Sequence, residues 1–233
     1  MGEERMSGKG RGLGIAAVVV GLVGLLSGVG GFVGARQGFG GAVVPGESMT
    51  PTHGPGDRVV FEQIGGSDVR RGDVVVFSAP DRYGFDQLVM ARVIGVGGDH
   101  VTCCRGTGAD TRIAVNGTPL REPYLENPEA SRGFVTPAYD VRVPEGRLFM
   151  LGDHRANARD ARAFLDDRGG TLPESVIRGR VIDDYTVPVV LGSAMLLGAL
   201  AVPTGVGLGI AAVVVRRRAR SAAVPPAPWA VQS

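Results

Sequence analysis

The run Asp73-Val74-Val75-Val76-Phe77 (DVVVF) is the clearest secondary-structure signal in the middle of the chain. Three valines followed by an aromatic residue are typical of a β-strand, because β-branched side chains pack well on a pleated surface. Gly72 stands directly before the run, and a Gly-Asp pair beside such a run is typical of a turn. These residues predict a strand that begins at a turn.

Similar β-branched runs lie on both sides of this strand. Asn116-Gly117 is the strongest hairpin signal, because both residues tolerate the positive φ angles of a tight β-turn. Long helical periodicity is lacking between residues 36 and 184. We therefore predict a mainly β domain, in one lobe or two. The other runs are Arg58–Phe61, Ala91–Val96 and Ile113–Val115, and further Gly-Asp pairs stand at 56–57, 98–99 and 152–153.

Two long uncharged stretches flank the β region. Leu13–Val33 has 21 residues and would be about 31 Å long as a helix, which matches a bilayer core. It is too long for a typical signal-peptide core, and no clean A-x-A cleavage site follows, so we predict a retained anchor. The second stretch, Tyr185–Val215, contains Pro203 and Gly205. It predicts one kinked or tilted span, and two short spans are the alternative.

Basic residues at the two ends predict the orientation of these spans. The N-terminal tail carries Arg5, Lys9 and Arg11, and four arginines follow the second stretch. Positively charged flanks stay in the cytoplasm, so both termini are predicted to be cytoplasmic and the middle region extracytoplasmic. The predicted domains are cytoplasmic tails at 1–11 and 216–233, transmembrane helices at 12–35 and 185–215, and an extracytoplasmic β domain at 36–184.

Charge and cysteine content exclude several functions. The net charge of the chain is only +2, and residues 36–184 alone carry a net charge of −3, so a nucleic-acid partner is not expected. The two cysteines, Cys103 and Cys104, are adjacent, which excludes a disulfide scaffold and a cysteine zinc site. They are expected to be either two thiols or a vicinal bridge. No cofactor and no metal is expected.

A serine with a suggestive setting follows the first uncharged stretch. Ser48 lies in Val43–Thr52 (VVPGESMTPT), beside a glycine and a proline. A serine held in such a loop near a membrane surface can be a nucleophile, and the alternative is an ordinary turn or capping residue. This segment alone does not separate the two interpretations.

Four motifs in order carry a resemblance to a known family. They are Ser48–Thr52 (SMTPT), Arg71–Pro80 (RGDVVVFSAP), Arg92–Asp99 (RVIGVGGD) and Gly152–Arg162 (GDHRANARDAR). Together they resemble bacterial type I signal peptidase, a membrane-bound β-fold serine protease with a Ser/Lys dyad. The resemblance covers about Val43 to Arg180. It implies a signal-peptidase-like β domain in a bacterial plasma membrane, with the signal peptides of exported precursors and the lipid bilayer as partners.

The resemblance also assigns roles to individual residues. It implies that Ser48 is the nucleophile, and that the Ser48 main-chain N–H helps to hold the oxyanion. It places Met49 and Pro51 in the substrate-binding region, which in this family accepts small side chains. The residues implied to brace the site are Asp153, Arg155, Asp160 and Arg162.

The chain departs from the family at the general base. The family has a lysine directly before the RVIG stretch, and this position is Ala91. A serine needs a group that takes its proton, which alanine cannot do, and the guanidinium of Arg92 stays charged. Lys9 is the only lysine of the chain and lies on the predicted cytoplasmic side.

A second departure is linked to the first. The family serine whose hydroxyl orients the lysine is replaced by Ala158, and the next family serine is replaced by Ala161. Among the three histidines, His53 is the candidate substitute base, because it lies five residues after Ser48. His100 and His154 are interpreted as structural residues.

Three hypotheses follow from these residues. The chain is a signal peptidase I homologue that cleaves signal peptides through Ser48. Alternatively, it is a catalytically impaired relative that binds signal peptides, a sister signal peptidase or the secretion machinery, because Ala91 and Ala158 replace the base and its orienter. A membrane-anchored β scaffold without a substrate groove is the third hypothesis, and the four motifs argue against it.

Overall fold

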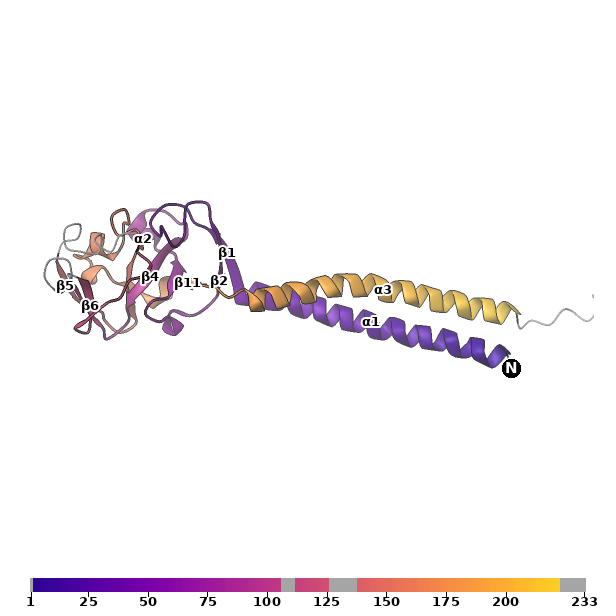
Figure 1. Ribbon diagram of the computed structural model, residues 1–233. Coiled ribbons are helices and arrows are strands. Elements are labelled where there is room, and N and C mark those ends of the chain that lie inside the picture. Colours follow the sequence, from indigo (N-terminus) through magenta and orange to yellow (C-terminus); the bar gives the residue numbers. More distant parts are fainter. Residues whose placement is uncertain (1, 106–111, 126–137, 223–233) are drawn as a thin grey trace, which may run out of the picture. The chain divides into compact units, whose positions relative to one another are not determined.

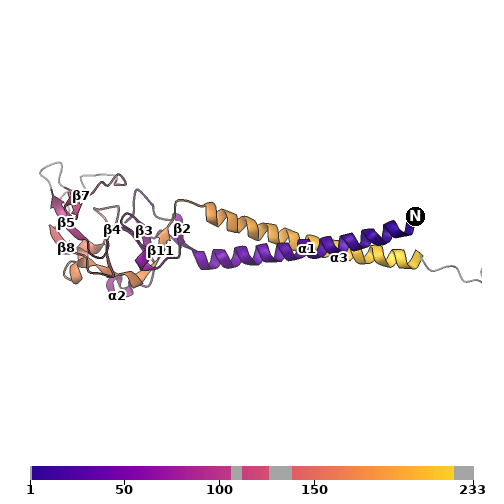
Figure 2. The same cartoon turned by 90° about the horizontal axis from the view of Figure 1, so that it is seen from below.

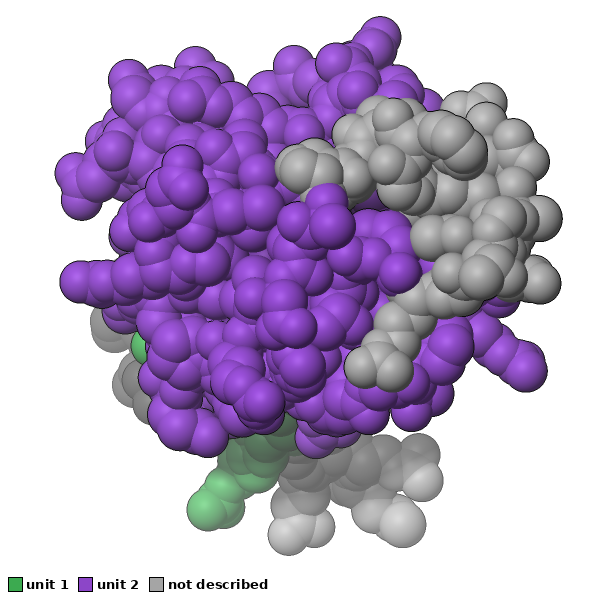
Figure 3. Space-filling view, turned by 90° about the vertical axis from the view of Figure 1, so that its left-hand side faces the viewer, with its two compact units in different colours: residues 1–37, 184–233 green, residues 38–183 purple. Residues whose placement is uncertain are grey.

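The structure is a computed structural model that describes residues 2–105, 112–125 and 138–222. The chain divides into two compact units, which are described separately below. One unit contains residues 1–37 and 184–233, and the other contains residues 38–183 (Figure 3).

The first unit is a pair of long apolar helices. Helix α1 spans Gly2–Gly38 and helix α3 spans Thr186–Ala222. The segments Arg11–Gly38 and Thr186–Ala219 have the length and the apolar composition that a membrane crossing requires. Pro203 lies inside α3 and does not end it, so the second stretch forms one helix rather than two short ones. Which side of a membrane each end faces stays a prediction.

Glycines bring these two helices into close contact. Figures 1 and 2 both show α1 and α3 side by side. A Cβ on Gly198 would lie 2.6 Å from the carbonyl oxygen of Gly24, and a Cβ on Gly205 would lie 2.8 Å from the amide nitrogen of Gly21. Small residues at such positions let two helix backbones approach closely, which is a common way for helices to associate in lipid.

The second unit is built mainly from β-strands, as the sequence predicts. Its larger sheet has seven strands in the order β1-β2-β11-β3-β4-β9-β10, and every neighbouring pair is antiparallel. The strands are β1 (Phe39–Val43), β2 (Arg58–Glu62), β11 (Ile177–Val181), β3 (Val74–Phe77), β4 (Val89–Gly95), β9 (Arg147–Leu151) and β10 (Leu172–Pro173).

A second sheet has four strands in the order β7-β6-β5-β8. Its β6–β7 hairpin turns at Asn116-Gly117, where φ is 52° and 81°, so the predicted turn is confirmed. The strands are β5 (His100–Arg105), β6 (Arg112–Val115), β7 (Thr118–Pro119) and β8 (Tyr139–Arg142). The short helices of this unit are α2 (Pro80–Tyr83), η1 (Gly66–Asp68), η4 (Ala161–Phe164), η5 (Arg168–Gly170) and η6 (Glu174–Val176).

Strand β3 is buried on both of its faces. Val75 packs into a cluster with Phe77 and Ala91, whereas Val76 packs into another cluster with Met49 and Met90. Val75 and Val76 have no exposed surface. A strand covered on both sides needs apolar residues at successive positions, and this explains the continuous DVVVF run.

Candidate active site

The loop that carries Ser48 joins β1 to β2 and is anchored by the residue after the serine. The side chain of Met49 has no exposed surface and packs in the cluster that contains Val76 and Met90. The loop closes on itself through the amide of Thr50, which donates to Glu47 O at 3.1 Å, and the amide of His53, which donates to Met49 O at 2.9 Å. Buried Met49 therefore fixes the position of half-buried Ser48.

The same loop is docked onto the segment that follows β9. The amide of His154 donates to the carbonyl oxygen of Ser48 at 3.0 Å. The ring Nδ1 of His154 lies 3.1 Å from Glu47 O, and Asn157 Nδ2 donates to the Glu47 carboxylate at 3.1 Å. The Ser48 loop is thus held by main-chain and side-chain contacts to residues 154–157.

Gly152 is the point at which Ser48 and Ala158 meet. A Cβ at position 152 would lie 2.5 Å from Ser48 O and would overlap the Ala158 methyl group. Only glycine fits between them without displacing one of the two. The fourth motif therefore brings Ala158 to the Ser48 loop.

Asp153 links strand β4 to this loop. Its two carboxylate oxygens accept from Arg92, at 2.8 Å for Nε–Oδ1 and 2.6 Å for Nη2–Oδ2. Thr52 Oγ1 also donates to Asp153 Oδ2, at 2.5 Å. The Arg92 guanidinium lies over the ring of Tyr124, with 3.9 Å from Cζ to the ring centroid. A buried charge needs such paired donors, and the Asp153 side chain is fully buried.

Asp160 and Arg155 hold the main chain of Gly152 from both sides. The amide of Gly152 donates to Asp160 Oδ2 at 3.0 Å, and Gly152 O accepts from Arg155 Nε at 3.0 Å. Arg162 forms two side-chain bonds to the Asp160 carboxylate, at 2.8 and 2.7 Å. These residues brace Gly152 and, through it, the contact with Ser48.

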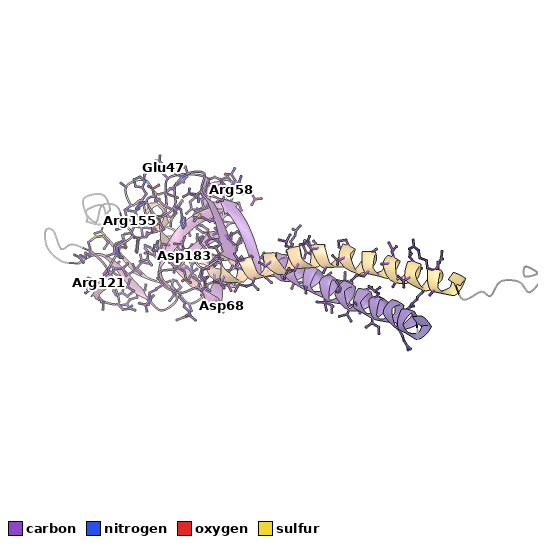
Figure 4. The ribbon with its side chains drawn as sticks, turned by 45° about the vertical axis from the view of Figure 1, so that its right-hand side comes forward. Glu47, Arg58, Asp68, Arg121, Arg155 and Asp183 are labelled. Carbon is purple, nitrogen blue, oxygen red and sulfur yellow. A yellow bond between two sulfur atoms is a disulfide. The ribbon has the colours of Figure 1, made fainter. Side chains whose placement is uncertain are left out.

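Arg155 has a buried partner that no sequence motif indicates. Its Nη2 lies 2.5 Å from Glu122 Oε1, and the two side chains are 1% and 5% exposed. Burial alone lowers the pKa of Arg155, but the charge and the hydrogen bond of Glu122 outweigh it and raise the pKa above the ordinary value. Arg155 therefore stays charged inside the unit. Arg155 and Glu47 both lie in the β unit (Figure 4).

The side chain at position 91 lies in an apolar environment. Ala91 is 4% exposed on β4, is paired with Val75 on β3, and packs in a cluster with Val93 and Met150. The methyl group of Ala91 has no atom that could accept a proton. The preceding residue, Met90, packs in the same cluster as Met49.

The histidines and cysteines occupy different places. His53 is half-buried in the Ser48 loop, and His154 binds that loop directly. His100 Nε2 lies 2.6 Å from Asp140 Oδ1 on the four-stranded sheet. Cys103 and Cys104 form a vicinal disulfide in β5, which is one of the two states that the sequence allows. In the part of the chain that the structure describes, no group of three or more His, Cys, Asp or Glu residues could hold a metal.

The sequence interpretation missed three residues that contribute to the site. Glu47 and Asn157 act on the Ser48 loop, and Glu122 supports Gly152 through Arg155. Glu47 directly precedes Ser48, so proximity to the serine was a usable signal. Glu122 lies in a stretch without a recognised motif, and only the folded chain brings it to Arg155.

Comparisons with known proteins identify relatives of this chain. A family model described as signal peptidase, peptidase S26, matches residues 15–185. Signal peptidase I of Mycobacterium tuberculosis H37Rv is 30% identical over 186 residues, with 59% of this chain and 62% of the relative covered. Signal peptidase IB of Staphylococcus aureus N315 is 35% identical over 153 residues, with 59% and 73% covered.

A solved signal peptidase I from Enterococcus faecalis V583 is 26% identical to this chain, with a TM-score of 0.38, and the match covers 49% of this chain and 97% of that one. The chain spans 62% of the length of the mycobacterial relative. The family model, in contrast, covers well over half of the chain, including the Ser48 loop, the β-strands and the segment after β9. The chain therefore belongs to the peptidase S26 family of signal peptidases.

Proposed function

We propose that this chain acts on the signal peptides of exported precursors at the outer face of a bacterial plasma membrane, with Ser48 as the nucleophile. The anchoring of the Ser48 loop carries the proposal. Buried Met49 holds it on one side, and the His154 amide holds the Ser48 carbonyl on the other at 3.0 Å. A nucleophile needs such a fixed position, because a small misplacement costs a large part of the rate.

The proposed membrane arrangement follows the charges of the chain. Helices at 12–35 and 185–215 span the bilayer, and the basic tails at 1–11 and 216–233 lie in the cytoplasm. The β domain at 36–184 then lies outside, where the signal peptide of an exported protein is accessible. Two apolar helices of sufficient length support this arrangement.

The proposed reaction is attack of Ser48 Oγ on the carbonyl carbon of the scissile peptide bond. The hydroxyl proton must pass to a base, and the leaving amine must later receive a proton. By resemblance, the base position is Ala91, and the position of its orienting hydroxyl is Ala158. Neither methyl group takes part in proton transfer, so we expect hydrolysis by this chain to be slow. His53 is the proposed substitute base.

A second candidate function is binding of signal peptides without turnover, and the replacement of both family residues favours it. Ala91 is buried among apolar side chains, and Ala158 lies against Gly152 beside the Ser48 carbonyl. A chain with this pair of alanines keeps the main-chain geometry of the site. It lacks the group that would activate the serine.

Cleavage of a preprotein by the full chain in detergent separates the two candidates. If the chain is a peptidase, product accumulates and the Ser48→Ala variant forms none. If it only binds, a photocrosslinking signal peptide labels both proteins equally and neither forms product. Absence of both product and labelling would contradict the proposed function.

A further inference from the structure

A pocket of about 290 Å³ lies in the β unit, and none of its lining residues is assigned to proton transfer. It is formed by the segment that follows β3, the start of β9 and the turn around η5. Three arginines and two aspartates provide its charged lining, namely Arg82, Arg147, Arg168, Asp81 and Asp167. The pocket is far larger than the roughly 30 Å³ that one water molecule occupies in the liquid.

Two of the guanidinium groups converge on the same carbonyl oxygen. Arg82 Nη2 donates to Thr171 O at 3.0 Å, and Arg147 Nη2 donates to the same oxygen at 2.6 Å. Arg82 also donates to Gly170 O at 2.7 Å, and Arg147 Nε donates to Thr171 Oγ1 at 2.7 Å. Both arginines are therefore fixed by the turn that follows η5.

The positive charges in this pocket exceed the negative charges close to them. Asp167 lies 2.6 Å from Arg82 Nη2, but its side chain is 64% exposed, so solvent weakens the pairing. Burial lowers the pKa of Arg147, and the nearby charges of Arg168 and Arg82 lower it further. Like charges held together in this way create a site that favours an anion.

The guanidinium groups of Arg82 and Arg147 also carry N–H donors that the bonds described above do not use. Each carries five N–H donors, and the side-chain bonds of Arg82 and Arg147 described above involve about half of the ten. The exposed side chain of Arg168, which also lines the pocket, adds a third guanidinium group. Planar N–H forks match the paired oxygens of a phosphate group, as they do those of a carboxylate.

We propose that this pocket binds a phosphate group, either as free phosphate or as the phosphodiester of an anionic lipid headgroup. Arg82, Arg147 and Arg168 all line it. The Arg82 guanidinium also lies over the ring of Phe164, 5.0 Å from the centroid, at the end of η4. Occupancy would therefore steady η4, which follows the Asp160 that holds Gly152. The proposal is independent of turnover at Ser48.

Binding is tested with the full chain in detergent by titration with sodium phosphate at constant ionic strength, followed by thermal unfolding. The test variant is Arg168→Gln, because the turn is held by the side chains of Arg82 and Arg147 in the part of the chain that the structure describes. The matched control is Arg178→Gln, an exposed arginine on β11 outside the pocket. We expect phosphate to raise the unfolding temperature of the wild type and of Arg178→Gln, and Arg168→Gln to weaken the apparent affinity about tenfold.

A second arm separates the two sources of the phosphate group. Short-chain phosphatidylglycerol and short-chain phosphatidylcholine are titrated in place of phosphate. A response to phosphatidylglycerol at lower concentration than to phosphate identifies a lipid headgroup, and the reverse order identifies free phosphate. The proposal would be overturned if neither phosphate nor phosphatidylglycerol gave a response, or if Arg168→Gln and Arg178→Gln responded equally.

Discussion

Arg92 and Asp153 form a two-pronged ion pair, with 2.8 Å between Nε and Oδ1 and 2.6 Å between Nη2 and Oδ2. Arg92 follows Ala91 on β4, and Asp153 follows Gly152, which contacts Ser48. The pair therefore ties the strand that carries the proposed base position to the loop that carries the proposed nucleophile. Thr52 joins it from the Ser48 loop itself.

Removing the charge of Asp153 should destabilise the β unit. In Asp153→Asn the Arg92 guanidinium, 12% exposed, loses its buried carboxylate, and we expect the free energy of unfolding to fall by about 3 kcal/mol. Urea unfolding of the full chain in detergent measures the change. The control is Asp140→Asn, whose pairing with His100 is at the surface and should cost less than about 1 kcal/mol. Equal losses in the two variants would contradict the structural role of Asp153.

A methyl group at Gly152 should displace the Ser48 loop. The Cβ of Gly152→Ala would lie 2.5 Å from Ser48 O and would overlap Ala158, so we expect a loss of about 2 kcal/mol from overpacking. Gly46→Ala is the control in the same loop, because a Cβ there meets no atom within 4 Å. Thermal unfolding and crosslinking to a signal peptide are the measurements. A Gly152→Ala variant as stable and as reactive as Gly46→Ala would show that Ser48 is not held in this way.

Breaking the buried ion pair between Glu122 and Arg155 should destabilise the β unit about as much as Asp153→Asn does. In Glu122→Gln the Arg155 charge, 1% exposed, has lost its counter-ion, and we expect a loss of about 3 kcal/mol in unfolding free energy. Glu145→Gln changes the same charge at an exposed turn and serves as the control. Calorimetry of both variants gives the difference. Matching transition temperatures would rule out a supporting role of Glu122.

Alkaline pH should unfold the β unit through its buried tyrosines. Burial raises the pKa of Tyr83 from 10.0 to about 12, and the charge of Asp160 contributes to this rise. Burial also raises the pKa of Tyr124 and of Tyr139. A raised pKa favours the neutral phenol in the folded state. The stabilisation is therefore complete below pH 10 and is lost as the pH rises towards 12 and beyond.

Phenolate absorbance and circular dichroism, recorded together against pH, test this expectation. Phenolate from these tyrosines should appear with the loss of β-structure, and Tyr83→Phe should make the fall in stability between pH 10 and 12 less steep. Full ionisation of the tyrosines in a chain that keeps its circular dichroism would contradict their burial.

Much of the fold was predictable because its signals are local. The DVVVF run forms the centre of the large sheet, Asn116-Gly117 forms a turn, and the two uncharged stretches form helices. The sequence predicted one kinked or tilted span through Pro203, with two short spans as the alternative. In α3 the helix continues through it, and neighbouring apolar residues are compatible with such a helix in lipid.

The candidate site was predictable only in part. Asp153 accepts from Thr52 of the Ser48 loop, and Asp160 accepts from the amide of Gly152, although the roles of both in the reaction remain predictions. Glu122 was missed, because its contact with Arg155 joins segments that lie about 30 residues apart. Glu47 stands next to Ser48, but its contact with Asn157 joins segments about 110 residues apart. Long-range pairs of this kind leave no periodic pattern in one sequence.

The central proposal is that Ser48 is the nucleophile and that Ala91 stands at the position of the missing acceptor for its proton. The decisive measurement is the rate of preprotein cleavage by Ala91→Lys combined with Ala158→Ser, compared with the unmodified chain. We expect the double variant to be faster by at least about 100-fold, because a positioned base contributes that much. The gain should vanish when Ser48→Ala is added. A folded double variant that gains nothing, or an unmodified chain that already cleaves as fast through Ser48, would contradict the claim.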